Sequence, residues 1–243
     1  MKIGVFAYNF EHWKVQNGIH NLVLGGYSPS VIFAANRVDL KFYQSKVRIT
    51  PKDLFLHHPK FVADHYKIDY HVVEHNSEKT SAMIKDYGLD LGVILGARIL
   101  KPHIIDSFNL GVLNTHPGIL PDNRGLDNHK WAILEDIPQG VTAHLIDGKI
   151  DKGRLVDQER INIYKDDTLL DVFLRVQNLE QKLMLSSLDK LKRIDSVNDL
   201  EELGSGTYRK PPTADVEKYL FEKFEKYKTK YACDITKTSE DLL

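Results

Sequence analysis

The sequence has little cysteine, no long apolar run and no excess of one charge. Cys233 is its only cysteine, which excludes a disulfide framework and a cysteine-based metal cluster and favours a reducing, cytoplasmic setting. No segment approaches the ~20 apolar residues of a membrane span, and the first residues are too polar for a signal peptide. Lys and Arg number 33 against 34 Asp and Glu, so a nucleic-acid partner held by bulk charge is not expected.

The composition is sufficient for one ordinary core. Apolar residues make up 42% of the 243 residues, which suits one domain with a small addition. The composition changes near "GSGTYRKPPT", a stretch of turn-forming and stiffening residues. We therefore predict a main domain over residues 1–192 and a C-terminal appendage over residues 193–243, which contributes to ligand binding or to a dimer.

Apolar and amphipathic segments alternate along the first part of the chain. The run "LDLGVILGA" (89–97) is typical of a strand buried on both faces of a parallel sheet. This alternation predicts an α/β fold with a doubly wound, mostly parallel sheet. Strands are predicted at 2–8, 30–36, 70–74, 89–97, 111–115, 140–146 and 154–163, and helices at 13–27, after Pro59, at 77–87, 127–136 and 168–192, and after Thr213.

Two residues with chemically active side chains lie at the end of the predicted strand "GVLNT" (111–115). Asn114 and His116 are two positions apart, so on an extended strand their side chains point the same way. Pro117 ends the ladder there, and ligands of doubly wound sheets bind outside such carboxyl ends. A carboxamide donates and accepts, and an imidazole moves protons near neutral pH. A single histidine at a strand end is also compatible with a hydrogen-bonded surface residue.

The loop "DGKIDKG" (147–153) carries two carboxylates between glycines. Glycine lets the backbone turn sharply and approach a ligand closely. A carboxylate from Asp147 or Asp151 placed beside His116 would raise the pKa of that histidine and orient it. Aspartates flanked by glycine are also common turn formers.

These motifs together resemble the folate-dependent formyltransferase family. The stretch "NTHPGILPDNRGLDNHKWAI", followed by "GVTAHLIDGKIDKGRLV", is similar to its Asn-x-His-x-x-x-Leu-Pro element and later aspartate loop. "GARILKP" (96–102) resembles the element that lines the folate pocket. The resemblance covers roughly residues 89–165 and implies a Rossmann-like formyltransferase fold with 10-formyltetrahydrofolate as co-substrate and no metal.

The resemblance also implies roles for individual residues. The catalytic positions would be Asn114, His116 and Asp151, with Asp151 preferred to Asp147 because it precedes a small residue and a glycine. Asn114 and a protonated His116 would stabilise charge on the formyl oxygen during attack by the acceptor amine. His116 would move a proton from the amine toward folate N10, with Asp151 tuning it. The cofactor-binding positions would be Arg98, Ile99, Leu100, Asn114 and Asp147.

The acceptor follows less directly from the sequence. Methionyl-tRNA enzymes of the family add a basic C-terminal barrel, which the short region after residue 192 and the neutral charge do not match. Glycinamide ribonucleotide enzymes carry a Gly-Ser-Asn phosphate loop after the first strand, where this chain has "YNFEHWK" (8–14). Enzymes that formylate nucleotide-linked amino sugars tolerate aromatic and charged residues there. A thymidine-diphosphate aminodideoxyhexose is therefore the expected acceptor, with a place in bacterial lipopolysaccharide O-antigen biosynthesis.

Predicted acceptor-binding residues come from two segments. Tyr208 would stack on the base while Arg209 and Lys210 face the diphosphate, and His12 and Trp13 would line the cleft mouth. The same residues are compatible with a solvated loop and with the core. A homodimer is expected through the aromatic residues Tyr219, Phe221 and Phe224 of the appendage.

Three other functions remain open from the sequence. They are glycinamide ribonucleotide formylation, hydrolysis of formyl-folate, and a catalytically silent nucleotide-binding α/β protein. The complete Asn-His-Asp set speaks against a silent protein, because such a protein has no need to keep all three residues. Hydrolysis of formyl-folate would require water at the position of the acceptor amine, which a tightly bound nucleotide sugar would exclude.

Overall fold

A mixed seven-stranded sheet forms the centre of the chain, as the sequence predicts. The computed structural model describes residues 1–38, 43, 45–148 and 153–233. The strand order is β3-β2-β1-β4-β5-β7-β8. The first five strands in this order are parallel, and the pairings β5–β7 and β7–β8 are antiparallel. The strands are β1 (Ile3–Tyr8), β2 (Val31–Ala35), β3 (Asp69–Val72), β4 (Leu91–Ile94), β5 (Gly111–His116), β7 (Gly140–Ile146) and β8 (Gly153–Arg160).

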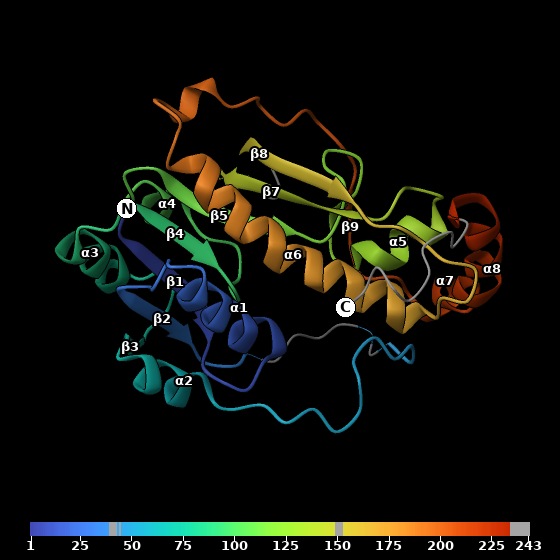
Figure 1. Ribbon diagram of the computed structural model, residues 1–243, viewed down its shortest axis with the longest axis horizontal. Helices are drawn as coiled ribbons and strands as arrows, with labels where there is room; N and C mark the ends of the chain where they lie inside the picture. Colours follow the sequence, from blue (N-terminus) through green and yellow to red (C-terminus); the bar gives the residue numbers. More distant parts are fainter. Residues whose placement is uncertain (39–42, 44, 149–152, 234–243) are drawn as a thin grey trace, which may run out of the picture.

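Helices cover both faces of this sheet (Figure 1). On one face lie α1 (Trp13–Leu24), α2 (Pro59–Tyr66) and α6 (Leu169–Leu191), which share a core with Val5, Leu113 and other strand residues. On the opposite face α3 (Glu78–Tyr87) and α4 (Pro102–Ile105) share a second core with Phe6, Phe33 and Val112. The doubly wound arrangement follows from apolar side chains on both faces of the central strands.

Most predicted elements are present within a few residues of the expected bounds. The helix predicted at 168–192 begins with a reciprocal capping box, in which the Thr168 side chain accepts from the Asp171 N–H. The predicted helix after Thr213 is in fact two helices, α7 (Ala214–Glu217) and α8 (Leu220–Tyr231), and Thr213 makes no side-chain cap.

A small additional ladder was not predicted. Strand β6 (Arg124–Gly125) pairs in parallel with β9 (Tyr208–Arg209), so the loop after His116 is bonded to the "GTYRKPP" loop. Both strands have only two residues, too few for an alternating pattern to show. This pairing places the C-terminal appendage beside the carboxyl end of β5.

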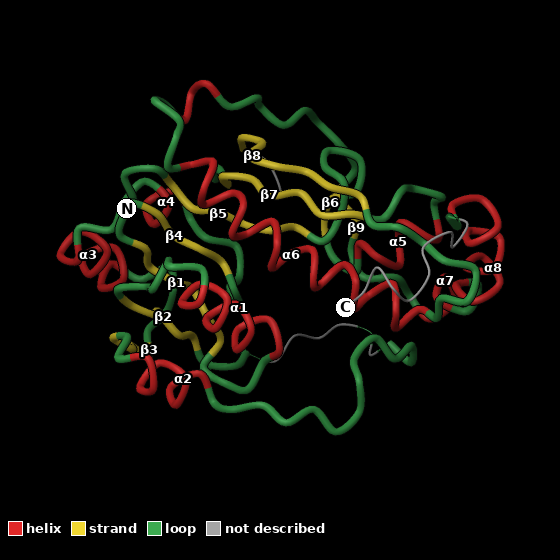
Figure 2. The backbone as a smooth tube through the Cα atoms, in the orientation of Figure 1, coloured by secondary structure: helices red, strands yellow, loops and turns green. Residues whose placement is uncertain are grey.

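The appendage packs against α5 (Asn128–Leu134) and a long loop. Figure 2 shows that residues 45–58, which precede α2, form a loop that extends toward α5 and α7. Val47 from this loop joins Ile133, Leu220 and Phe224 in a third core. Phe224 is buried within its own chain, whereas Tyr219 and Phe221 remain exposed. Across the described residues, no helix is both long and apolar enough to cross a membrane.

Candidate active site

Asn114 and His116 lie at the carboxyl end of β5, on one face of the sheet. Leu113 points into the core under α6, so the alternation of the strand turns Asn114 and His116 toward the face that holds Val112. His116 is only 3% exposed, whereas Asn114 is partly exposed. The sheet thus buries the imidazole and leaves the carboxamide accessible.

A second histidine, His144, completes this pair and was missed from the sequence. It lies opposite Asn114 on the antiparallel strand β7, and Asn114 Nδ2 is 3.2 Å from His144 Nε2. The amide nitrogen only donates, so His144 accepts through Nε2. His144 is fully buried, with its ring 6.4 Å from that of His116. A histidine within the otherwise apolar strand "GVTAHLI" was the available sequence signal.

The orientation of His116 is set by the loop that follows it. His116 Nε2 donates to the Asn123 carbonyl at 2.8 Å, and that oxygen also accepts from Asn128 Nδ2 at 2.8 Å. Because a carbonyl only accepts, His116 carries its proton on Nε2. A Cβ at Gly118 would lie 3.1 Å from His116 Nε2 and 2.8 Å from the Asn123 oxygen, so this close turn requires glycine.

Two residues on β7 and β8 hold that loop in place. Thr142 Oγ1 donates to the Gly118 carbonyl at 2.7 Å and accepts from the Leu120 N–H at 3.0 Å. Gln158 Nε2 donates to the Leu120 carbonyl and to Thr142 Oγ1, each at 2.9 Å. The peptide bond between Leu120 and Pro121 is cis. These bonds fix the loop on the sheet from the strands beside β5.

A buried ion pair supports β5 from its other face. Lys14 Nζ, from α1, donates to the Thr115 carbonyl at 3.1 Å and to Glu180 of α6 at 2.6 Å. Glu180 is 5% exposed. The pair therefore joins two helices to the peptide that directly precedes His116.

The predicted folate-binding residues lie after β4. Arg98 and Ile99 are exposed and Leu100 is buried. The Ile99 carbonyl accepts from Asn76 Nδ2 at 2.9 Å, and the Arg98 guanidinium donates to the Val38 carbonyl at 3.2 Å. Their role toward folate stays a prediction.

The two aspartates of the glycine loop differ in what the structure shows. Asp147 follows β7 and lines a cavity of about 440 Å³ together with Gly111, Arg154 and Glu202. In the antiparallel register this end of β7 lies beside the beginning of β5, away from His116. Asp151 lies outside the described residues, so its catalytic role and the preference for it over Asp147 stay predictions.

His12 and Trp13 begin α1 at the carboxyl end of β1. The His12 ring contacts the Tyr8 ring edge-on, at 5.1 Å between centroids, and Tyr8 stacks on Phe10 at 4.9 Å. Burial, and secondarily the charge of Lys14, lowers the pKa of His12 to about 4, so it is neutral at pH 7. Trp13 is half-buried. An uncharged aromatic cluster therefore occupies this position.

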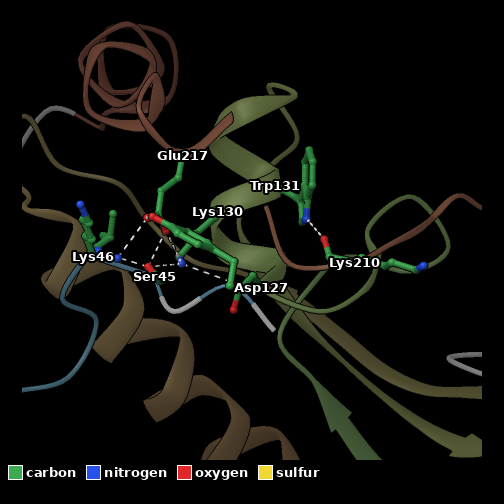
Figure 3. Close-up of polar contacts among 9 residues, drawn as sticks. Ser45, Lys46, Asp127, Lys130, Trp131, Lys210 and Glu217 are labelled. Carbon is green, nitrogen blue, oxygen red and sulfur yellow. Dashed lines mark hydrogen bonds and ion pairs between the residues drawn. The ribbon is translucent and has the colours of Figure 1, made fainter. Parts of the chain in front are cut away.

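The "GTYRKPP" loop uses its arginine to hold itself in place. Arg209 donates through Nε to Glu135 at 2.8 Å and through Nη1 to the Asp122 carbonyl at 2.7 Å. The Lys210 carbonyl accepts from Trp131 Nε1 at 2.8 Å, while the Lys210 side chain points away from that contact (Figure 3). Tyr208 is 43% exposed. Of these three residues, Tyr208 and Lys210 present side chains outward.

The arrangement is suited to proton transfer and to stabilising an oxyanion. The Asn114 amide and the His116 imidazole lie on one face of the sheet, where an amide N–H can stabilise an oxyanion and an imidazole can exchange protons. Within the part of the chain that the structure describes, no three His, Cys, Asp or Glu side chains gather in a way that would hold a metal ion.

Comparison with known proteins places the chain in a family. The family description "Formyl transferase" matches residues 43–188, more than half of the chain. Methionyl-tRNA formyltransferase of Borrelia garinii subsp. bavariensis is 31% identical over 112 residues, which are 45% of this chain and 36% of that protein. The match therefore spans little more than a third of that curated relative.

Solved structures share the fold. A sugar N-formyltransferase from Shewanella sp. FDAARGOS_354 is 21% identical with a TM-score of 0.57, covering 86% of this chain and 76% of that one. Phosphoribosylglycinamide formyltransferase from Anaplasma phagocytophilum is 17% identical with a TM-score of 0.62, covering 86% and 99%. The formyltransferase PseJ from Anoxybacillus kamchatkensis, solved with UDP-4,6-dideoxy-4-formamido-L-AltNAc and tetrahydrofolate, is 27% identical with a TM-score of 0.50, covering 67% and 85%.

Proposed function

Because the chain belongs to the formyl transferase family, we propose that it transfers a formyl group from 10-formyltetrahydrofolate to the amine of a nucleotide-linked amino sugar. The observation that carries the proposal is the constellation at the end of β5. There Asn114, His116 and His144 meet on one face of the sheet, with His116 oriented by the Asn123 carbonyl.

The residues around this constellation fit a folate co-substrate. Exposed Ile99 offers an apolar surface after β4, and exposed Arg98 offers a cation for a carboxylate tail. The partly exposed amide of Asn114 faces the same side of the sheet as the buried His116. When bound, 10-formyltetrahydrofolate would supply an activated formyl group.

The side chains then have distinct tasks. Asn114 Nδ2 has two N–H groups, of which one is directed to His144, and the other would donate to the formyl oxygen as it gains charge. The Nε2 proton of His116 is held by the Asn123 carbonyl, so proton exchange with the acceptor amine would take place at Nδ1. Asp151 would favour the protonated form of that imidazole.

We infer the acceptor from the residues at the end of β1 and in the loop after it, and from one structural relative. The loop after β1 presents Tyr8, Phe10 and a neutral His12, and not a glycine-rich nest for a terminal phosphate. PseJ, which shares 27% identity, was solved with a nucleotide-linked formamido sugar. These two observations support a nucleotide sugar over glycinamide ribonucleotide. The thymidine-diphosphate aminodideoxyhexose type is our proposal from the family resemblance alone.

The same proposal gives the protein a biological setting and an assembly. A formylated nucleotide sugar is a precursor for a bacterial surface polysaccharide such as O-antigen. Exposed Tyr219 and Phe221 on the appendage would contribute to a homodimer contact, whereas Phe224 packs inside the chain.

Two experiments test the proposal. Thermal unfolding with a non-hydrolysable folate analogue tests the co-substrate, because a ligand at 100 times its Kd stabilises the folded state by about 2.7 kcal/mol. No shift in Tm at saturation contradicts the folate assignment. A panel of nucleotide-linked amino sugars, with glycinamide ribonucleotide as the competing acceptor, tests the substrate by formyl-folate turnover. Faster formylation of glycinamide ribonucleotide than of every sugar contradicts the acceptor assignment, and turnover without any acceptor indicates hydrolysis.

A further inference from the structure

A lysine ammonium is buried beside the active site without belonging to it. Lys130 of α5 is 1% exposed. Its Nζ contacts Ser45 Oγ at 2.7 Å, Glu217 Oε1 at 2.8 Å and Asp127 Oδ2 at 3.2 Å (Figure 3). Three acceptors match the three protons of an ammonium, so the buried charge is fully satisfied.

Glu217 brings the appendage and the long loop into this cluster. Its carboxylate also accepts from Ser45 Oγ, from the Lys46 N–H at 3.1 Å and from Tyr43 at 3.1 Å. Glu217 is 5% exposed and belongs to α7. One ion pair therefore joins α5, the appendage and the loop after β2.

The cluster lies next to Asn128, the residue that holds the Asn123 carbonyl against His116. Asp127 precedes α5 with φ of 53°, a left-handed conformation that is strained for a residue with a side chain. Its side chain does not cap the helix and is instead paired with Lys130. The next residue, Asn128, exchanges side-chain to backbone hydrogen bonds with Asn123 in both directions, at 2.8 Å each.

These contacts form one continuous path. Lys130 holds Asp127 and, through it, the first turn of α5. That turn carries Asn128, which holds the Asn123 carbonyl, and the carbonyl accepts from His116 Nε2. Strained backbone persists where its surroundings over-determine it, and here the buried ammonium supplies that constraint.

We propose that Lys130 is a positioning residue for His116, holding the first turn of α5 so that the Asn123 carbonyl keeps His116 in its Nε2–H tautomer. The proposal rests on the proposed function for its kinetic consequence. Lys130 contacts Ser45, Asp127 and Glu217, and it acts on His116 through Asp127, Asn128 and Asn123.

The test variant is K130M/E217Q. Removing Lys130 alone would leave the Glu217 carboxylate buried and unpaired, so the second change removes that charge as well. The matched control is R175M/D167N, which removes another ion pair with a 5%-exposed aspartate, at the beginning of α6. This control shares no contact with the path to His116. If K130M/E217Q does not fold, D127G replaces it, because glycine adopts positive φ and removes the tether at a partly exposed position.

The first measurement is nitrogen-15 NMR of the histidine imidazoles, with His116 assigned by its absence in H116N. In K130M/E217Q, we expect the His116 Nε2–H signal to give way to a mixture of tautomers with faster proton exchange. The control is expected to retain the wild-type signal. A folded K130M/E217Q or D127G with wild-type His116 signals overturns the proposal.

The second measurement is steady-state kinetics on the proposed substrates. We expect kcat to fall by about tenfold while the KM for 10-formyltetrahydrofolate stays within about twofold, because orientation and not binding is lost. An equal loss of kcat in R175M/D167N overturns the proposal, since it indicates a general structural effect. If the wild type formylates no acceptor, the proposed function fails, and the NMR result still decides the role of Lys130.

Discussion

The carboxyl end of β5 and the junction around Lys130 are held together in different ways. At β5, His116, Asn114 and Thr142 make neutral hydrogen bonds to partners 7, 30 and 22 residues away in the chain. At the junction, a buried ammonium and a buried carboxylate join segments 85, 87 and 172 residues apart. The first region is built by strand pairing and a tight loop, and the second by charge.

This difference indicates which region responds to which perturbation. Neutral hydrogen bonds within a sheet are insensitive to pH until a histidine titrates. A buried ion pair depends on both charges, and losing one partner leaves the other desolvated. We therefore expect kcat to be sensitive to single side-chain substitutions at the end of β5. We expect the attachment of the appendage to depend on pH.

The largest expected effect is on turnover at β5. H116N should lower kcat by about a hundredfold or more, about 2.7 kcal/mol, because proton transfer is lost while asparagine keeps a polar group in the strand. D151N, in the loop outside the described residues, should lower kcat to a similar extent. The measurement is kcat together with Tm. Near-normal turnover in a folded variant removes that residue from the mechanism.

The next effect is on stability at the charged junction. Burial alone would raise the pKa of Glu217, but hydrogen bonds from Lys130, Ser45 and the Lys46 N–H outweigh it and lower the pKa to about 2. A carboxylate with a lowered folded pKa stabilises the protein above its unfolded value near 4.5, and this contribution is lost as pH falls toward 2. E217Q should therefore lower the free energy of unfolding by about 3 kcal/mol at pH 7 and by progressively less below pH ~4.5.

Urea unfolding of both proteins at pH 7, 5, 4 and 3 checks this expectation. The exposed pair Lys60–Asp64 provides a control, because D64N should change stability by less than about 1 kcal/mol at every pH. A difference between E217Q and the wild type that does not narrow on acidification would show that the pair is not what stabilises the junction.

A smaller effect is expected on acceptor binding. Y208A/R209A should raise the KM for the nucleotide sugar by roughly tenfold, about 1.4 kcal/mol, with little change in the KM for folate. Since Arg209 is anchored on Glu135, the single variant Y208A separates stacking from loop anchoring. K218A, at an exposed cation of the appendage, serves as the control. An unchanged sugar KM would leave His12 and Trp13 as the acceptor-binding candidates.

The smallest effect is expected at Asp147. The family resemblance assigns the catalytic aspartate to Asp151 and not to Asp147, so D147N should lower kcat by about threefold or less, about 0.6 kcal/mol. The measurement is kcat of D147N beside that of D151N. A larger loss in D147N than in D151N would reverse the assignment within the loop.

The fold and the position of Asn114 and His116 on β5 were predictable because their determinants are local. Continuous apolar runs identify buried parallel strands, and period-two alternation places Asn114 and His116 on one face. Their position before Pro117 marks a strand end, where doubly wound sheets bind ligands.

The partners of those residues were decided only by tertiary structure. His144 meets Asn114 through the register of two antiparallel strands, and a register is not written in either strand alone. Lys130, Ser45 and Glu217 look like ordinary surface residues in the sequence, because burial of a charge depends on segments far apart in the chain. Arg209 was predicted to face a ligand, and the fold gave it Glu135 and the Asp122 carbonyl as partners. The sequence by itself determined that this strand ends in Asn114 and His116. Packing decided which side chains surround these two residues, because contacts between distant segments arise only when the sheet has formed.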